Sequence, residues 1–170
     1  MKLLLVRHAI AEDTETFNAA GGGSDALRPL TEAGRKKMRK GANRLRTQLS
    51  GIDLLASSPL LRARETADII ARAFGEVPVV ERTELDYHAP VEVALGWLEQ
   101  LPGSGTVLVV GHQPHLGLLA GLLLTGAARP LIAFRKGGAA LLEFPDRISA
   151  GEGVLHWVLT ASQLRSLKQD

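Results

Sequence analysis

Hydrophobic residues along this chain follow two patterns that alternate. One is a short continuous apolar run, which is typical of a strand buried on both faces of a parallel sheet. The other places apolar residues three or four positions apart, as on one face of an amphipathic helix. The apolar runs predict strands over residues 2–6, 52–58, 77–80 and 106–112, with two further strands over 139–144 and 154–160.

The helical spacing predicts helices over residues 31–49, 59–74, 91–101 and 114–124. Before the second helix, Ser58 is expected as the N-cap and Pro59 as the first helical residue, because proline lacks the N–H that a first turn leaves unpaired. Residues 9–29 show neither pattern and include the run GGGSD at 21–25. This segment is therefore expected to form an irregular loop.

Strands that alternate with helices are typical of an α/β fold. We therefore expect a three-layer sandwich, in which a mostly parallel central sheet carries helices on both faces. The chain has 170 residues, of which 45% are hydrophobic and 22% are charged, as in an ordinary globular domain. A single domain over residues 1–170 is expected.

The amino-acid composition excludes several kinds of site and argues against several classes of function. The chain has no cysteine, which excludes disulfides, thiolate zinc sites and cysteine nucleophiles. Its most apolar stretch, residues 116–128, is shorter than the roughly 20 residues that a membrane-spanning helix needs. The formal net charge is +2 and aromatic residues make up 4%, so the basic block GRKKMRK at 34–40 is expected to be a solvated helix face. We expect a soluble, cytoplasmic protein that binds neither nucleic acid nor membrane.

Cationic residues follow the predicted strands at the same end. Arg7 and His8 come directly after the first strand. Arg62 lies in the first turn after the second strand, and His112 closes the fourth. Because the carboxyl ends of parallel strands meet at one edge of a sheet, these side chains are expected to converge. Guanidinium groups bind oxyanions in a bidentate way, so the cluster predicts a pocket for a phosphoryl group.

A histidine in such a pocket can attack phosphorus, forming a covalent phosphohistidine that water then hydrolyses. The imidazole must be neutral, and neighbouring arginines lower its pKa. A hydrogen bond from its other ring nitrogen to a backbone carbonyl would fix the tautomer. The arginines and the second histidine would offset the charge on the phosphoryl oxygens. This chemistry needs neither a metal nor a cofactor.

Four ordered segments resemble the histidine phosphatase superfamily, which includes cofactor-dependent phosphoglycerate mutases and acid phosphatases. They are RHA at 7–9, RPLTEAG at 28–34, SSPLLRARETA at 57–67 and VGHQP at 110–114. The short chain, RHAIAE and VGHQPHL are most similar to the phosphohistidine phosphatases of the SixA type. The resemblance implies a phosphoglycerate mutase-like fold and a role in signal transduction.

The same resemblance assigns roles to individual residues. It implies that His8 is the nucleophile and that His112 is a second histidine that stabilises the transferring group. Arg7 and Arg62 are implied to bind the phosphoryl group. Ser58 joins them as a substrate-binding residue, since the turn that it begins would hold Arg62 in place.

The stretch TELDYHAP at 83–90 departs from the superfamily, where a Leu-x-Glu pattern supplies the acid that protonates a leaving alcohol. Here Leu85 is followed two positions later by Tyr87, and the carboxylates of Glu84 and Asp86 flank that position out of register. Either carboxylate is an alternative for the general acid. Losing such an acid slows phosphomonoester hydrolysis by roughly 10²–10⁴-fold, whereas an imidazole leaves readily. The departure therefore favours phosphohistidine as the substrate.

Other functions stay open from the sequence. One is a small-molecule phosphomonoesterase of the same superfamily, and another is a non-catalytic module that binds a phosphorylated ligand. The expected partner is a phosphohistidine-bearing protein, such as a phosphorelay domain, or else a small phosphorylated substrate. A short chain has little room for insertions, so an open and shallow pocket is expected.

His112 and His115 form an H-x-x-H pair, which is a spacing that metal sites also use. Zinc would need a third protein ligand, and Pro114 between the two histidines predicts a strand-to-helix turn. No metal site is therefore expected, and His115 is expected at the rim of the pocket.

Overall fold

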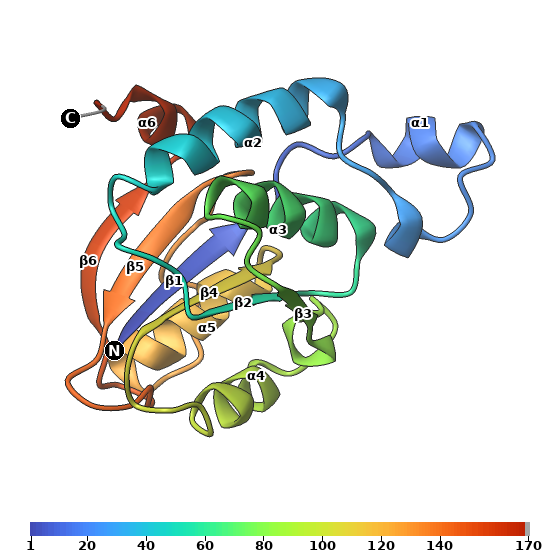
Figure 1. The fold of residues 1–170 in the computed structure, drawn as a ribbon. Coiled ribbons are helices and arrows are strands. Elements are labelled where there is room, and N and C mark those ends of the chain that lie inside the picture. The colour runs from blue at the N-terminus through green and yellow to red at the C-terminus, as the bar shows by residue number, and fades with distance from the viewer. Residues whose placement is uncertain (169–170) are drawn as a thin grey trace.

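The computed structural model describes residues 1–168, and a six-stranded sheet forms the centre of the molecule (Figure 1). The strands are β1 (Lys2–Arg7), β2 (Leu54–Ser57), β3 (Val79–Glu81), β4 (Thr106–Gly111), β5 (Ala139–Glu143) and β6 (Val154–Leu159). Their order is β3-β2-β4-β1-β5-β6. β1 to β4 run parallel, and β5 is antiparallel to both of its neighbours. The expected mostly parallel sheet is confirmed.

Helices cover both faces of this sheet, as predicted (Figure 1). The helices are α1 (Thr14–Ala19), which projects away from the sheet, and α2 (Glu32–Leu45), α3 (Leu61–Ala73), α4 (Val91–Leu98), α5 (His115–Thr125) and α6 (Ala161–Ser166). Because successive side chains of a strand point to opposite faces, β1 contributes to two cores. Leu4 and Val6 pack in the core on the side of α2 and α3. Leu3 and Leu5 pack in the core that contains α4 and α5.

Several short helical elements were not predicted. α1 and a short 3₁₀ turn, η1 (Asp25–Leu27), lie in the segment that was expected to be an irregular loop. Neither has a buried residue, so neither shows an apolar period in the sequence. α6 begins with a capping box made by Thr160 and Gln163 and buries only Leu164. Elements this short are set by their caps and leave little hydrophobic pattern to detect.

The predicted start of α3 was wrong. The helix begins at Leu61 with Leu60 as its N-cap, and no side chain caps it. Ser58 still pairs with the neighbouring strand at the end of β2, because its backbone N–H donates to the carbonyl of Val110 at 3.0 Å. Sheet pairing therefore outweighs the local preference of Ser58 and Pro59 for a helix start.

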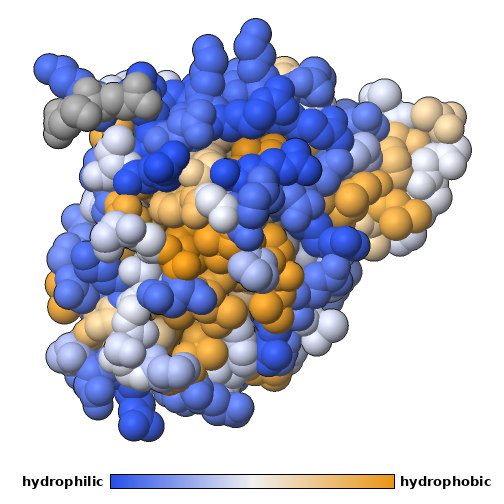
Figure 2. All heavy atoms as spheres, viewed as in Figure 1, coloured by the Kyte–Doolittle hydropathy of each residue, from blue (hydrophilic) through white to orange (hydrophobic). Residues whose placement is uncertain are grey.

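The basic block of α2 is a solvated face, as expected. Met38, Ala42 and Leu45 of α2 are buried, whereas its lysines at 36, 37 and 40 are exposed. Figure 2 shows the α2 side of the molecule as a hydrophilic ridge. The apolar stretch at 116–128 is largely α5, a core helix as predicted. Within residues 1–168, no helix is long and apolar enough to cross a membrane.

Candidate active site

The register of two central strands brings both histidines of the predicted site together. β1 pairs with β4 so that Arg7 lies opposite Gly111, and each strand is followed at once by a histidine. The backbone N–H of His8 donates to the carbonyl of Gly111 at 3.0 Å. The imidazole centroids of His8 and His112 lie 5.2 Å apart. Parallel pairing, which the apolar runs predicted, thus creates the pair.

The two predicted arginines reach the same place from different elements. Arg7 ends β1, and its Nη1 donates to the carbonyl of Phe134 at 2.7 Å. Arg62 lies in the first turn of α3 and is 3% exposed. With the two histidines they line a pocket of about 510 Å³. The other lining residues are Glu12, Asp13, Thr14, Asp25, Arg28, Tyr87, Gln113 and Lys136.

His8 is held as a neutral imidazole with one defined tautomer. Its Nδ1 lies 2.7 Å from the carbonyl oxygen of Ala9, which can only accept, so Nδ1 carries the proton and Nε2 has a free lone pair. The pKa of His8 is lowered to about 3, chiefly by burial; the charges of Arg62, Arg7 and Lys136 also lower it, against the effect of the Ala9 carbonyl. The sequence predicted the arginines as the cause, but burial is the larger one.

His112 is held by Ser58, which was predicted to bind the substrate. The Oγ of Ser58 and Nε2 of His112 share a hydrogen bond of 2.8 Å. Ser58 is fully buried and does not line the pocket. Burial, followed by the charges of His8 and Arg62, lowers the pKa of His112 to about 2. Ser58 therefore orients His112, and the structure does not bear out its expected place against the substrate.

Three buried nitrogen atoms around the pocket lack hydrogen-bond partners within residues 1–168. They are Nε of Arg7, Nε of Arg62 and Nδ1 of His112. Buried polar atoms are rarely left unpaired, so these three nitrogens are donors available to a ligand. Arginine nitrogens can only donate, so these groups suit an anion with several oxygen acceptors. A phosphoryl group has that chemistry.

A carboxylate from the unpredicted η1 turn enters the pocket beside Arg62. The backbone oxygen of Asp25 accepts from Nη1 of Arg62 at 2.9 Å, and its Oδ2 lies 3.1 Å from Nη2. Its Oδ1 accepts from Nε of Arg28 at 2.7 Å. Burial alone would raise the pKa of Asp25, but the bonds and charges of Arg28 and Arg62 hold it below its usual value. The sequence missed this contact because no local pattern relates residues 25 and 62.

The two expected general acids do not line the pocket. Glu84 pairs with Arg82 at 2.8 Å. Asp86 accepts from the backbone N–H of His88 at 3.0 Å and faces the His88 ring. Tyr87, which stands between them in the sequence, does line the pocket.

His115 is not at the rim. It is 2% exposed in the first turn of α5, and its two ring nitrogens have no hydrogen-bond partner among the described residues. Because the helix turns it inward, His115 does not line the pocket that holds His112. In the part of the chain that the structure covers, no three His, Asp or Glu side chains gather as a metal site would require.

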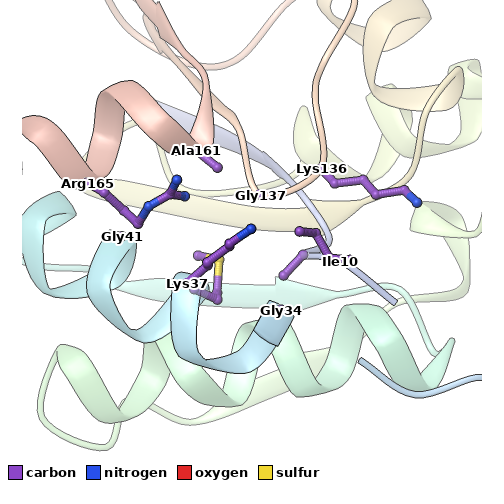
Figure 3. A pocket seen from close by; sticks show the side chains of 10 residues that line it. Ile10, Gly34, Lys37, Gly41, Lys136, Gly137, Ala161 and Arg165 are labelled. Atoms are coloured by element: carbon purple, nitrogen blue, oxygen red, sulfur yellow. The ribbon is translucent and has the colours of Figure 1, made fainter. Parts of the chain in front are cut away.

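Lys136 is a pocket residue that the sequence did not reveal. It belongs to the turn after Phe134, where Gly137 donates its N–H to the carbonyls of Arg7 and His8 at 3.1 and 3.0 Å. A small neighbouring hollow has a volume of about 30 Å³. In Figure 3, its lining side chains come from α2 and α6 on one side, and Lys136 extends away from Lys37 and Arg165. The ammonium group is thus available to the active-site pocket, which Lys136 also lines.

Known proteins share this sequence and architecture. The model of the histidine phosphatase superfamily (branch 1) matches residues 3–88. An uncharacterized protein of Picosynechococcus sp. is 33% identical over 141 residues, which cover 81% of this chain and 82% of that one. Phosphohistidine phosphatase SixA of Escherichia coli is 28% identical over 171 residues, 99% of each chain.

Solved structures agree with these matches. The protein histidine phosphatase SixA, complexed with tungstate, superposes with a TM-score of 0.81 at 28% identity and covers 96% of this chain and 99% of its own. A phosphoserine phosphatase from Entamoeba histolytica, at 19% identity and a TM-score of 0.66, covers 96% of this chain and 98% of its own and shares the fold. The sequence and structural matches place this chain in the histidine phosphatase superfamily (branch 1), as a phosphatase with a histidine nucleophile.

Proposed function

We propose that this chain hydrolyses phosphohistidine on another protein, through a covalent phosphohistidine formed on His8. The observation that carries the proposal is the state of His8, a neutral imidazole whose free Nε2 belongs to a pocket lined by arginines. The full-length similarity to the E. coli protein named phosphohistidine phosphatase supports the choice of substrate.

In the first step, Nε2 of His8 attacks the phosphorus of the substrate. The bond from phosphorus to the substrate imidazole breaks, and its electron pair stays on that imidazole nitrogen, which takes a proton from solvent. Arg7, Arg62 and Nδ1 of His112 would donate to the phosphoryl oxygens, and these are the groups with unpaired buried donors. Preorganised donors of this kind stabilise the charge that develops in phosphoryl transfer.

In the second step, a water oxygen attacks the phosphorus on His8. The P–Nε2 bond breaks and its electron pair returns to Nε2, which restores the neutral imidazole of His8. Inorganic phosphate leaves with the oxygen of the water, and the surplus proton passes to solvent. The mechanism has no step that a metal would have to perform.

Two of the three carboxylates that line the pocket, Asp13 and Asp25, support a nitrogen leaving group. Asp25 is bound to two arginines and has a lowered pKa. Asp13 caps α1, and the bonds from Thr16 lower its pKa as well. A carboxyl group with a low pKa is ionised at neutral pH and is a poor proton donor. An alkoxide would need such a donor, whereas an imidazole does not.

The width of the pocket supports a protein substrate. It has a volume of about 510 Å³ and reaches the exposed residues Asp13 and Thr14 at its rim. A histidine side chain displayed on the surface of a phosphorelay domain would reach His8 through this opening. A role in signalling would follow from such a partner.

The first experiment compares phosphate release from a phosphohistidine-bearing protein domain with release from an aryl phosphomonoester. Both assays contain a chelator, and His8→Ala serves as the blank. The expected result is a large preference in kcat/KM for the phosphohistidine protein that the chelator leaves unchanged. Inhibition by the chelator would reject the metal-free mechanism.

A preference for the aryl ester would overturn the proposal in favour of a phosphomonoesterase. Glu12 would then be the acid to test by Glu12→Gln, since it lines the pocket and only its backbone forms hydrogen bonds among residues 1–168. Tight phosphate binding with no turnover of either substrate would instead indicate a binding module.

A further inference from the structure

Tyr87 forms the wall of the active-site pocket next to His112 and Arg62. Its ring lies 5.4 Å from the imidazole of His112, nearly edge to face at 71°. The Cζ of Arg62 lies over the tyrosine ring at 5.9 Å. The rings of His8, His112 and Tyr87 thus form a continuous wall. The ring centroids of His8 and His112 lie 5.2 Å apart, and those of His112 and Tyr87 lie 5.4 Å apart.

The loop around Tyr87 is anchored on both sides. Leu85, two residues before it, is fully buried in the core that contains α4 and α5. After it, the carboxylate of Asp86 accepts from the backbone N–H of His88, which closes a local turn. The ring of His88 lies 3.9 Å from the ring of Tyr87, tilted by 41°. The tyrosine ring is therefore held in place before any ligand arrives.

We propose that Tyr87 determines the specificity of the pocket for an aromatic leaving group, by stacking on the imidazole that departs from phosphorus. This inference rests on the proposed function. An in-line attack places the leaving nitrogen on the side of phosphorus opposite His8. Arg62 and His112 would bind the phosphoryl group between His8 and the leaving ring. The ring of Tyr87 lies next to both of these residues, on the side away from His8.

A tyrosine ring suits this leaving group better than a carboxylate would. The departing ring is planar; the proton that it takes from solvent makes it a neutral imidazole, and a second proton, with an ordinary pKa of about 6.5, makes it an imidazolium. Aromatic faces attract both planar rings and cations. Tyr87 gives no proton and forms no bond in this scheme, so the balance of the hydrolysis is unchanged. Its contribution is to bind the leaving ring.

Two small P–N compounds separate this role from a general effect on the site. Phosphoimidazole releases an aromatic ring, whereas phosphoramidate releases ammonia, and neither uses a protein surface. In Tyr87→Leu, we expect the ratio of kcat/KM for phosphoimidazole to that for phosphoramidate to fall roughly five- to tenfold. Tyr87→Phe keeps the ring and should keep the wild-type ratio.

Several outcomes would overturn the inference. One is an equal loss on both compounds in Tyr87→Leu, which would make Tyr87 a support for His112 and Arg62. Another is a Tyr87→Phe variant as impaired as Tyr87→Leu, which would assign the effect to the phenol hydroxyl. A wild-type enzyme that cleaves the aryl phosphomonoester but neither P–N compound would overturn the proposed function itself, and the inference with it.

A measurement on the unmodified protein avoids any question of folding. Tyr87 is the only tyrosine in the chain, so ¹³C-labelled tyrosine gives a single set of ring resonances. With vanadate bound in place of phosphate, added imidazole should shift these resonances, and ammonium at the same concentration should not. No shift with imidazole would reject stacking at Tyr87.

Discussion

Two regions line the active-site pocket, and they are built in opposite ways. The strand-end cluster (Arg7, His8, Arg62 and His112) is attached to the central sheet, and three of its members are at most 6% exposed. The arm, residues 12–28, carries α1 and η1, neither of which has a buried residue. Figure 1 shows α1 extending beyond the rest of the molecule.

This difference separates chemistry from access. Burial is the largest cause of the low pKa values of His8 and His112, so the reactive groups depend on the core that surrounds them. The arm supplies Asp25, whose carboxylate forms an ion pair with the Arg62 guanidinium. This ion pair is partly open to solvent on the Asp25 side. Exposed ion pairs contribute little to stability. We therefore expect changes in the cluster to abolish activity and changes in the arm to adjust it.

The largest effect is expected from the nucleophile. His8→Ala should reduce kcat on a phosphohistidine protein by roughly 10³-fold or more, because the covalent step is lost. His156→Ala is the matched control, since His156 lies on the edge strand β6 and pairs with exposed Glu143. A His8→Ala enzyme with substantial turnover and an unchanged melting temperature would reject covalent catalysis.

The next effect tests the cluster through its second arginine. Arg62→Ala should lower kcat/KM by roughly 10²-fold, the loss typical of one electrostatic donor to a transition state. Arg64→Ala removes a neighbouring arginine of α3 that pairs with Glu81 on the surface, and it should leave kcat/KM within about twofold. Equal losses in the two variants would mean that α3, and not the Arg62 guanidinium, is what matters.

A smaller effect concerns stability and pH. The pKa of His8 is depressed to about 3, so below the unfolded value of about 6.5 the unfolded chain binds a proton that the native state does not. Stability from this group is complete above pH 6.5 and is lost as pH falls toward 3, by roughly 1 kcal/mol per pH unit. His8→Asn should flatten the decline in unfolding free energy between pH 6.5 and 4.5, measured by urea titration. Parallel curves for the two proteins would mean that His8 is not buried in its neutral form.

The smallest effect is expected in the arm. Asp25→Asn removes a charge that competes with phosphate for Arg62, so KM should fall about two- to fivefold with little change in kcat. Asp68→Asn provides a comparison, because Asp68 lies on α3 outside the pocket. A fall in kcat of tenfold or more in Asp25→Asn would show that the arm belongs to the catalytic machinery, and the distinction between the two regions would fail.

Much of this architecture could be predicted from the sequence. The strands at 2–6 and 106–112 lie within a residue or so of β1 and β4, because buried parallel strands are continuous apolar runs. That adjacency alone brings Arg7, His8 and His112 to one edge. Predictions based on local preference did less well, since Ser58 contacts His112 where an N-cap was expected.

The sequence by itself determined the fold class, the strand ends and the residues capable of phosphoryl chemistry, because apolar periodicity and residue type are local properties. Only the tertiary structure decided which carboxylates face the pocket. Asp25 and Arg62 meet through the path of the arm, and Asp86 turns to His88 while Tyr87 faces the pocket. It also decided the protonation of His8, because the pKa of an imidazole depends chiefly on how completely the rest of the chain excludes water from it.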